Sequence, residues 1–369
     1  MDPLLDRRRF LLGVSCFGAA AALARSIPLP AWAESVAKDP RVAEQPLLDK
    51  GFATVRKVGK GVYATISDFS KGPQTISNGG FLAGSEAALM IEGHGQPAGA
   101  AFELEALRMV SQVPVRGAVA THYHFDHTFG SAVFAAQGIP VWAHPKTAPL
   151  IVERYASIQG QDRAAIYAPF EKAVRNAAND PLRRQRAEGD LGVVKMIHES
   201  ADATVLALPN RTVDPGKAPV TIELGGLTAT IEAYPPGHTP GDVVVRVQEQ
   251  NITFTGDLVF SAMYPATFDG NMRSWRKSLE RFAAFGKDAL FVPGHGPMCG
   301  QEGIATLKAV MDDLANQAEK FHKAGVPVAE AQHRYEVPER FKNFPILAWS
   351  FCISPAIAKF YEEFEGRKS

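Results

Sequence analysis

The sequence is poor in cysteine and has no excess of either charge, and both absences exclude classes of protein. Three cysteines in 369 residues cannot form a framework of disulfides. Lysine and arginine together number 39, as do aspartate and glutamate, so the formal net charge is zero. Because nucleic-acid-binding proteins usually carry a basic excess, we expect no nucleic acid among the partners. Hydrophobic residues make up 46% of the chain, which is enough to bury the core of one large domain or of two ordinary ones.

The N-terminal region has no apolar run long enough for a stable membrane span. Residues 10–24 are uncharged, but a spanning helix needs about 20 apolar residues. This stretch follows three arginines at 7–9 and precedes an A-x-A cleavage pattern at 31–33. The combination predicts a twin-arginine (Tat) signal peptide over residues 1–33, and hence the Tat export machinery as a partner and a periplasmic location. A membrane anchor and a basic tail are the alternatives.

Strand and helix patterns alternate after a polar lead-in at residues 34–50. Strands are expected near residues 54–58, 61–66, 87–91, 117–121, 140–143, 227–231, 243–247, 252–255 and 289–292. Apolar residues have helical spacing at residues 98–112, 131–137 and 275–285. This alternation predicts an α/β layered fold.

Two segments add helices to this pattern. Residues 147–200 are helix-prone and charged, and we expect a helical insertion there, within a domain that covers residues 51–325. The arginines of this insertion either form an anion-binding lid or lie on a solvated surface beside balancing acids. Apolar residues from Ile304 to Phe321 form one helical stripe, which we expect to pack in the core. A C-terminal helical extension is predicted for residues 326–369.

Four side chains that commonly bind metals lie directly after the strand predicted at 117–121. His122, His124, Asp126 and His127 spell H-x-H-x-D-H. Alternate residues of an extended segment point the same way, so His122 and His124 can chelate one metal ion. Asp126 and His127 lie at the turn beyond and can face a second ion, about 3.5–4 Å from the first. Without a cation or hydrogen bonds, packing these groups together would cost much free energy.

This motif resembles that of the metallo-β-lactamase superfamily, and the later motifs of that family follow in order. His238 lies in the sequence Gly-His-Thr-Pro-Gly, Asp257 in Thr-Gly-Asp, and His295 in Pro-Gly-His-Gly. The resemblance covers residues 51–300, approximately. It implies an αβ/βα four-layer sandwich with a helical insertion, in which the site lies at the edge of two sheets.

The resemblance also implies a dinuclear metal site. By likeness, the ligands of the first ion are His122, His124 and His238. The ligands of the second ion are Asp126, His127 and His295, and Asp257 bridges both ions. Nitrogen and oxygen donors of this kind suit zinc, so we expect two Zn²⁺ per chain, with iron and manganese as alternatives.

A hydrolase of a small-molecule substrate is the function that this resemblance implies. Two ions lower the pKa of a shared water towards 7, and the resulting hydroxide, oriented by Asp126 as a catalytic residue, attacks an ester, amide or thioester. The ligand set with Asp257 resembles that of glyoxalase II, a thioester hydrolase. The similar β-lactamases have Cys or Ser at that position, and one group of them has Lys where this chain has Phe260. A β-lactamase and an iron-dependent oxidoreductase similar to sulfur dioxygenases are the alternatives.

The remaining histidines and cysteines fall outside this ligand set. His94 lies at a strand end and either supports the site or is a structural or surface residue, and we interpret His144 as structural. Solvent-facing side chains are expected for three histidines in charged helical sequence: His198, His322 and His333. Two cysteines are expected to be buried thiols or one disulfide, which export would allow: Cys299 and Cys352.

Overall fold

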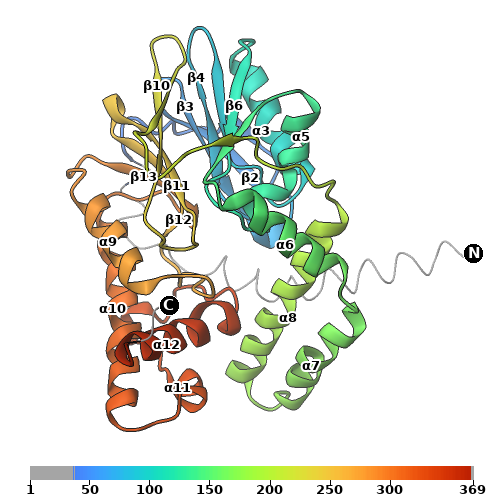
Figure 1. Ribbon diagram of the computed structural model, residues 1–369, viewed down its shortest axis with the longest axis vertical. Coiled ribbons are helices and arrows are strands. Elements are labelled where there is room, and N and C mark those ends of the chain that lie inside the picture. The colour runs from blue at the N-terminus through green and yellow to red at the C-terminus, as the bar shows by residue number, and fades with distance from the viewer. Residues whose placement is uncertain (1–35, 37, 367–369) are drawn as a thin grey trace, which may run out of the picture.

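The computed structural model describes Val36 and residues 38–366. The predicted signal peptide at residues 1–33 therefore lies outside the described residues. Two β-sheets face each other in the upper part of Figure 1, and helices cover their outer faces.

The first sheet has eight strands, which lie side by side in chain order. They are β1 (Leu48–Asp49), β2 (Ala53–Gly59), β3 (Val62–Ser67), β4 (Gly79–Ala83), β5 (Ala88–Ile91), β6 (Val115–Val119), β7 (Val141–Ala143) and β8 (Arg211–Thr212). Neighbours are antiparallel from β1 to β5 and parallel from β5 to β8. The parallel half places the loops after β5 and β6 at the same edge of the sheet.

The second sheet has five strands in the order β13-β12-β11-β10-β9. They are β9 (Val220–Glu223), β10 (Thr228–Ala233), β11 (Val243–Val247), β12 (Ile252–Phe260) and β13 (Leu290–His295). Only β12 and β13 pair in parallel in this sheet, and their register shifts between Phe254 and Gly256 and again between Gly256 and Phe260. These irregularities occur around Asp257, so the strand departs from regular pairing where it carries a predicted ligand.

The helices fall into three sets along the chain. The first set is α3 (Pro97–Val110), α4 (Phe125–Thr128) and α5 (Ala132–Ala136), and the second is α6 (Thr147–Gln159), α7 (Arg163–Asn176) and α8 (Pro181–Asp202). The third is α9 (Met272–Ala283), α10 (Gln301–Lys323), α11 (Val328–Arg334) and α12 (Trp349–Phe364). Short 3₁₀ turns are η1 (Phe69–Lys71), η2 (Phe129–Ser131), η3 (Gln248–Gln250) and η4 (Glu339–Phe341). Among the described residues, no helix has the length and apolar character that crossing a membrane requires.

The two sheets and the helices on their outer faces form four layers, and an apolar cluster lies between each pair of neighbouring layers. Leu89 of β5 packs with Phe254 of β12 in the cluster between the two sheets. Outside the first sheet, Met90 packs with Leu107 of α3. Outside the second sheet, the cluster joins the strands to residues of three helices, among them Leu279 of α9, Leu307 of α10 and Ile357 of α12. The predicted αβ/βα sandwich is therefore confirmed.

The apolar stripe of α10 lies in the core, as its spacing predicts. Ile304, Leu307, Met311, Leu314 and Ala318 are buried in the outer cluster, and Phe321 packs against it partly buried. The helix ends at Lys323, shortly before Gly325, whose φ of 69° favours glycine. Both Cys299 and Cys352 are free and buried, so the structure has two thiols there and no disulfide.

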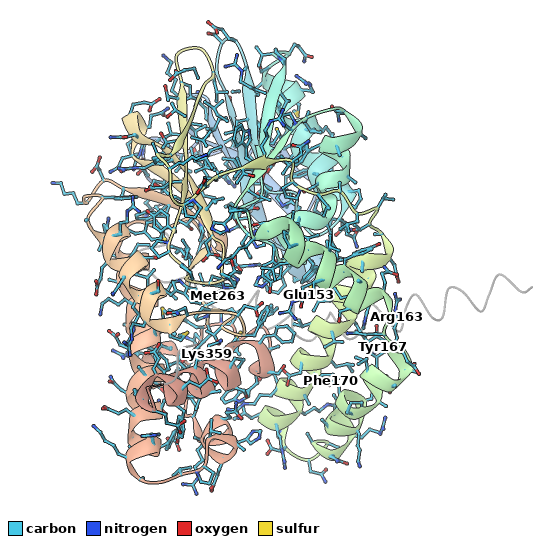
Figure 2. The ribbon with its side chains drawn as sticks, in the orientation of Figure 1. Glu153, Arg163, Tyr167, Phe170, Met263 and Lys359 are labelled. Carbon is cyan, nitrogen blue, oxygen red and sulfur yellow. The ribbon has the colours of Figure 1, made fainter. Side chains whose placement is uncertain are left out.

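Helices α6 to α8 leave the sandwich and return to contact its C-terminal helices. The side chain of Asp190 on α8 accepts hydrogen bonds from the backbone N–H and hydroxyl of Ser350, at 3.1 and 2.9 Å. The guanidinium of Arg186 lies 3.6 Å from the ring centroid of Trp349. These contacts satisfy a free N–H in the first turn of α12 and join the two sets of helices. Figure 2 shows Tyr167 of α7 and Lys359 of α12 on opposite sides of the lower half of the molecule.

Candidate metal centre

All seven predicted ligands are buried and come together in the structure. His122 and His124 lie between the end of β6 and α4. Asp126 and His127 lie within α4, which begins directly after the extended backbone at His124. His238 lies in the connection between β10 and β11, Asp257 lies within β12, and His295 ends β13. Donor atoms therefore reach the centre from both sheets, in two groups of neighbouring side chains.

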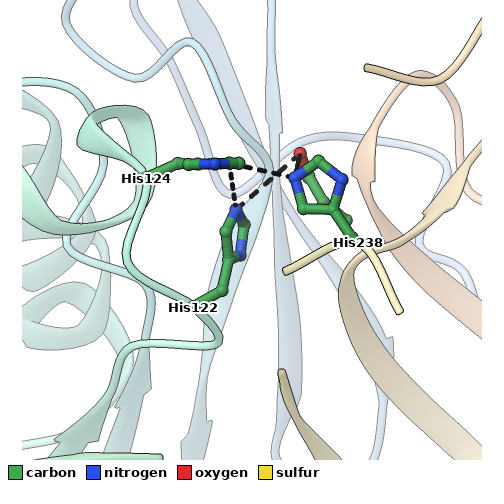
Figure 3. A group of neighbouring side chains, drawn as sticks. His122, His124 and His238 are labelled. Carbon is green, nitrogen blue, oxygen red and sulfur yellow. Dashed lines mark hydrogen bonds and ion pairs between the residues drawn. The ribbon is translucent and has the colours of Figure 1, made fainter. Parts of the chain in front are cut away.

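The first group contains three imidazoles and a carboxylate. Nδ1 of His124 lies 3.0 Å from Nε2 of His122 and 2.9 Å from Nε2 of His238. Oδ2 of Asp257 lies 3.2 Å from Nε2 of His238 and 3.9 Å from Nε2 of His122. Figure 3 shows these three rings turned towards one another, with each ring in a different plane. Four donors that face a common point in this way can surround a single cation.

The second group contains Asp126, His127 and His295. Oδ2 of Asp126 lies 3.1 Å from Nε2 of His295 and 3.4 Å from Nε2 of His127. The other oxygen of Asp257, Oδ1, lies 3.2 Å from Nε2 of His127 and 3.4 Å from Nε2 of His295. The carboxylate of Asp257 thus presents one oxygen to each group, which is the arrangement that a bridging ligand requires.

The buried atoms of this centre fit cations better than they fit one another. Among the described residues, Nε2 of His127 and Oδ1 of Asp257 are buried and have no hydrogen-bond partner. An unpaired polar atom in the interior costs about 1–3 kcal/mol. A cation bound between these atoms, which lie 3.2 Å apart, would remove that cost, because a carboxylate oxygen and an unprotonated imidazole nitrogen can each donate a lone pair to it. The residues present therefore fit two metal ions.

Without a cation, the two groups differ in protonation. Burial and neighbouring imidazoles lower the pKa of His122 well below its usual value, and burial lowers the pKa of His238 to about 3. Burial also opposes protonation in the second group, but Asp257 and Asp126 raise the pKa of His295 to about 9. At neutral pH His122 and His238 of the first group are therefore unprotonated nitrogen donors, whereas the second group holds a proton on His295.

A carboxylate that the sequence did not reveal holds His124. Oδ2 of Asp269 lies 3.1 Å from Nε2 of His124 and also accepts a hydrogen bond from the hydroxyl of Tyr123. Arg154 of α6 pairs with the other oxygen of Asp269 at 3.3 Å. Burial raises the pKa of Asp269, but these partners outweigh it and lower the value to about 2. The ionised carboxylate fixes the proton of His124 on Nε2 and leaves Nδ1 free to bind a metal.

A second carboxylate, that of Glu92, lies beside His127 as an ion-pair partner. Its Oε1 lies 3.1 Å from Nδ1 of His127, and its Oε2 accepts a hydrogen bond from the backbone N–H of Thr121 at 3.2 Å. Glu92 directly follows the apolar strand β5 and has a left-handed φ of 80°. A charged residue at the end of a wholly apolar run was the one sequence signal for this role, and for Asp269 the sequence gives no comparable signal.

The structure also places the remaining histidines. His94 is buried and structural, with Nε2 at 3.1 Å from Glu103 and Nδ1 at 3.3 Å from the carbonyl of Ser77. His144 is buried too, and its Nδ1 accepts a hydrogen bond from the backbone N–H of Lys146. The prediction for His198 was wrong, since its side chain is buried between α7 and α8.

The reason for that burial is hydrogen bonding. Nδ1 of His198 lies 2.9 Å from the hydroxyl of Tyr167, and Nε2 lies 2.8 Å from Oε1 of Gln161. Both ring nitrogens are satisfied without water, so a polar side chain can lie inside charged helical sequence. Two further histidines were expected to face solvent. His333 is exposed as predicted, and His322 is half-buried against Tyr361.

Solved structures of known proteins resemble this fold. A stereoselective inverting sec-alkylsulfatase from Pseudomonas sp. is 16% identical, with a TM-score of 0.54 over 85% of this chain and 50% of its own. A metallo-β-lactamase from Erythrobacter litoralis is 19% identical, with a TM-score of 0.47 over 71% of this chain and 97% of its own. One from Pontibacter korlensis is 20% identical, with a TM-score of 0.45 over 73% and 97%. At 16% identity, the similarity to the alkylsulfatase indicates a shared fold and nothing more.

A family model provides the stronger comparison. The model of the metallo-beta-lactamase superfamily matches residues 72–295, which is more than half of the chain. That range begins before β4 and ends at His295, so it contains all seven side chains of the two groups. The chain therefore belongs to the metallo-beta-lactamase superfamily.

Proposed function

We propose that this protein is a dinuclear zinc hydrolase that cleaves an ester, amide or thioester bond of a small-molecule substrate. Family membership and the two His/Asp groups indicate a metal-dependent hydrolase. The observation that carries the finer proposal is Asp257, whose two oxygens face different groups at 3.2 Å from His238 and from His127. A single-metal site would use only one of these two oxygens, whereas a bridged pair of ions uses both.

Each group has a distinct part in the proposed reaction. His122, His124 and His238 would hold one cation, and Asp126, His127 and His295 the other, with Asp257 between them. Two bound cations supply an acidified water and polarise the bond under attack. Zinc is favoured because five imidazoles and two carboxylates offer only nitrogen and oxygen donors.

Asp126 is the residue that we assign to orient the attacking water. Burial raises the pKa of its carboxyl group, but the imidazoles of His127 and His295 outweigh burial and hold that pKa well below its usual value. The group is therefore ionised at neutral pH and accepts a hydrogen bond. Its position beside His295 brings this acceptor to the second group.

Efficient hydrolysis of β-lactams is disfavoured by Phe260. The ring of Phe260 stacks on that of His295, with the centroids 5.2 Å apart and the planes 14° apart. It therefore supports a ligand and offers no cation for the carboxylate of a lactam, unlike the lysine of one β-lactamase group. An iron-dependent oxidoreductase is disfavoured by the number of donors, because sulfur dioxygenases hold one iron with fewer ligands.

Metal analysis beside a substrate panel tests the proposal. The purified protein is analysed for metals by mass spectrometry and assayed with esters, amides, thioesters, phosphate esters, sulfate esters and β-lactams. We expect two zinc ions per chain and turnover of an ester, amide or thioester. One iron per chain with consumption of O₂ would support the oxidoreductase, and efficient turnover of a lactam would support the β-lactamase.

Export through the Tat pathway is part of the same proposal. It rests on the arginines at 7–9 and the cleavage pattern at 31–33. Tat substrates cross the membrane already folded. A centre whose ligands come from both sheets suits such a route, since it forms only in the folded chain.

A further inference from the structure

One side of the metal centre borders a cluster of apolar side chains, which we call the apolar flank. It contains the buried residues Ile76, Val193 and Met196 and, packed against them, the partly exposed residues Phe125, Ile197 and Phe351. These residues come from four separate parts of the chain: the segment before β4, α4, α8 and α12. Two of these contributors, α8 and α12, lie outside the two sheets that carry the metal-binding residues.

Three contacts connect the apolar flank to the metal-binding residues. Phe125 stands in the chain between His124 and Asp126. Ile76 precedes Ser77, whose hydroxyl donates a hydrogen bond of 2.6 Å to the carbonyl of Asp126. The flank is therefore fixed to Asp126 on two sides.

The third contact passes through an aromatic ring. Phe268 lies over His124, with the centroids 4.8 Å apart and the planes 30° apart. It also meets Phe351 of α12 edge to face, at a centroid distance of 5.1 Å. A continuous line of rings thus runs from a ligand of the first group to the C-terminal helix.

Backbone strain occurs at the same place. Ile76 has a φ of 63°, a left-handed conformation that is rare for a β-branched residue. Such strain costs about 1–3 kcal/mol and persists where the surroundings hold it, most often at functional sites. Here it directs the side chain of Ile76 into the flank, where it is buried against α8.

Three large apolar side chains of the flank remain partly exposed beside a buried, charged centre. Phe125, Ile197 and Phe351 are each only partly buried. Apolar surface beside a set of convergent polar groups is the usual make-up of a small-molecule site, because the polar groups perform the chemistry and the apolar wall binds the rest of the ligand.

We infer that the apolar flank binds an uncharged alkyl or aryl group of the substrate, next to the bond that is cleaved. This inference rests on the proposed function, since it names the substrate class of the same site. Helix α8 supplies Ile197 and α12 supplies Phe351, so the insertion and the C-terminal extension determine specificity. Phe125, Ile197 and Phe351 are the specificity-determining residues.

Binding of uncharged alkanols to the zinc-loaded protein tests the inference without any turnover. Affinities for n-butanol, n-hexanol and n-octanol are measured by calorimetry. We expect the affinity to rise by about fourfold for each added methylene, the increment for transfer of one CH₂ from water to an apolar site. Ile197→Asp and Phe351→Ala should each remove most of this dependence on chain length, whereas Val205→Asp should retain it, because Val205 is 77% exposed and outside the flank.

The outcomes separate this inference from the proposed function. Ile197→Ala serves as a milder variant if Ile197→Asp fails to fold, and it should weaken octanol binding in the same direction. A dependence on chain length that disappears in these variants supports the inference even if no ester, amide or thioester is hydrolysed, a result that would count against the proposed function alone. Equal affinities for all three alkanols, or an unchanged dependence in the flank variants, would overturn the inference whatever the enzyme hydrolyses.

Discussion

Gly294 lies directly against the carboxylate of Asp257: a β-carbon on Gly294 would stand 1.9 Å from Oδ1 of that aspartate. The same β-carbon would also meet the backbone at Gly256, at 2.8 Å. Because the backbone at Gly256 is fixed within β12, the side chain of Asp257 must give way, and we expect Gly294→Ala to displace its carboxylate from the position between the two groups.

The expected result of Gly294→Ala is the loss of bound metal together with activity. Metal content by mass spectrometry and kcat on an identified substrate are the measurements. Gly192→Ala on α8 is the matched control, because a β-carbon there has nothing within 4 Å. It should leave metal content unchanged and stabilise slightly, by about 0.4–1 kcal/mol. Full metal content in Gly294→Ala would mean that Asp257 is not held in this position.

Asp257→Asn should lower activity far more than it lowers folding stability. An amide offers one neutral oxygen, so it cannot neutralise part of the charge of two cations. We expect about one ion per chain to leave, and kcat to fall by more than about 100-fold, beyond the loss typical of a residue that only supports a ligand. His333→Ala, at an exposed position of α11, is the control and should change little. Two retained ions with normal turnover would refute the bridging role.

Asp269→Ala should weaken metal binding although Asp269 is not a predicted ligand. Without the carboxylate, the proton of His124 is no longer fixed on Nε2, and metal affinity should fall by about 10–100-fold. Competition with a chelator measures this affinity. Asp312→Ala removes an exposed carboxylate paired with Lys308 on α10 and should leave metal affinity at its wild-type value. If both variants bind metal equally well, the proton of His124 is held by something else.

The two groups of metal-binding side chains should bind cations over different ranges of pH. His238 has a pKa of about 3, so it is neutral and ready to bind at pH 6. The pKa of His295 is raised to about 9, so a cation must displace its proton at every pH below that value. We therefore expect affinity at the second group to increase as pH rises towards about 9, while affinity at the first group changes less.

Calorimetry in buffers of different ionisation enthalpy measures this difference. The second equivalent of zinc should release more protons than the first at pH 7. Equal proton release in both steps would show that the two groups have the same charge before they bind metal.

Replacing Arg7 and Arg8 by lysine should keep the precursor in the cytoplasm, because the receptor of the Tat pathway reads the guanidinium pair. Cell fractionation measures the location, and sequencing of the exported wild-type protein should begin at Glu34. An unchanged yield in the periplasm would rule out this route.

Much of the fold was predictable because buried strands have a clear signature. The apolar run at 87–91 corresponds to β5, and the helical spacing at 98–112 corresponds to α3. Sequence analysis also selected every side chain of the two groups, because each lies in a short motif beside a strand. Local patterns of this kind depend only on neighbouring residues in the chain, so they can be recognised before the fold is known.

Other features were not predictable because they depend on distant contacts. Asp269 reaches His124 across 145 positions of sequence, and it lies in an irregular loop with no pattern of its own. His198 was expected at the surface because its neighbours are polar, but Tyr167 and Gln161 satisfy both ring nitrogens in the interior. Burial of a polar side chain is decided by partners that the local sequence does not show.

The division of the ligands between the two sheets has a consequence for how the protein acquires its metal. His124 and His238 are 114 positions apart, and His295 comes later still. During synthesis the first four metal-binding side chains leave the ribosome long before the other three. A nascent chain can therefore bind a metal ion with only part of the ligand set. Coordination by all seven side chains is possible only after β13 has joined the second sheet. Metal binding would therefore occur late in folding and would indicate that both sheets have formed. Once bound, the ions would connect the two sheets, because each group takes donors from both of them.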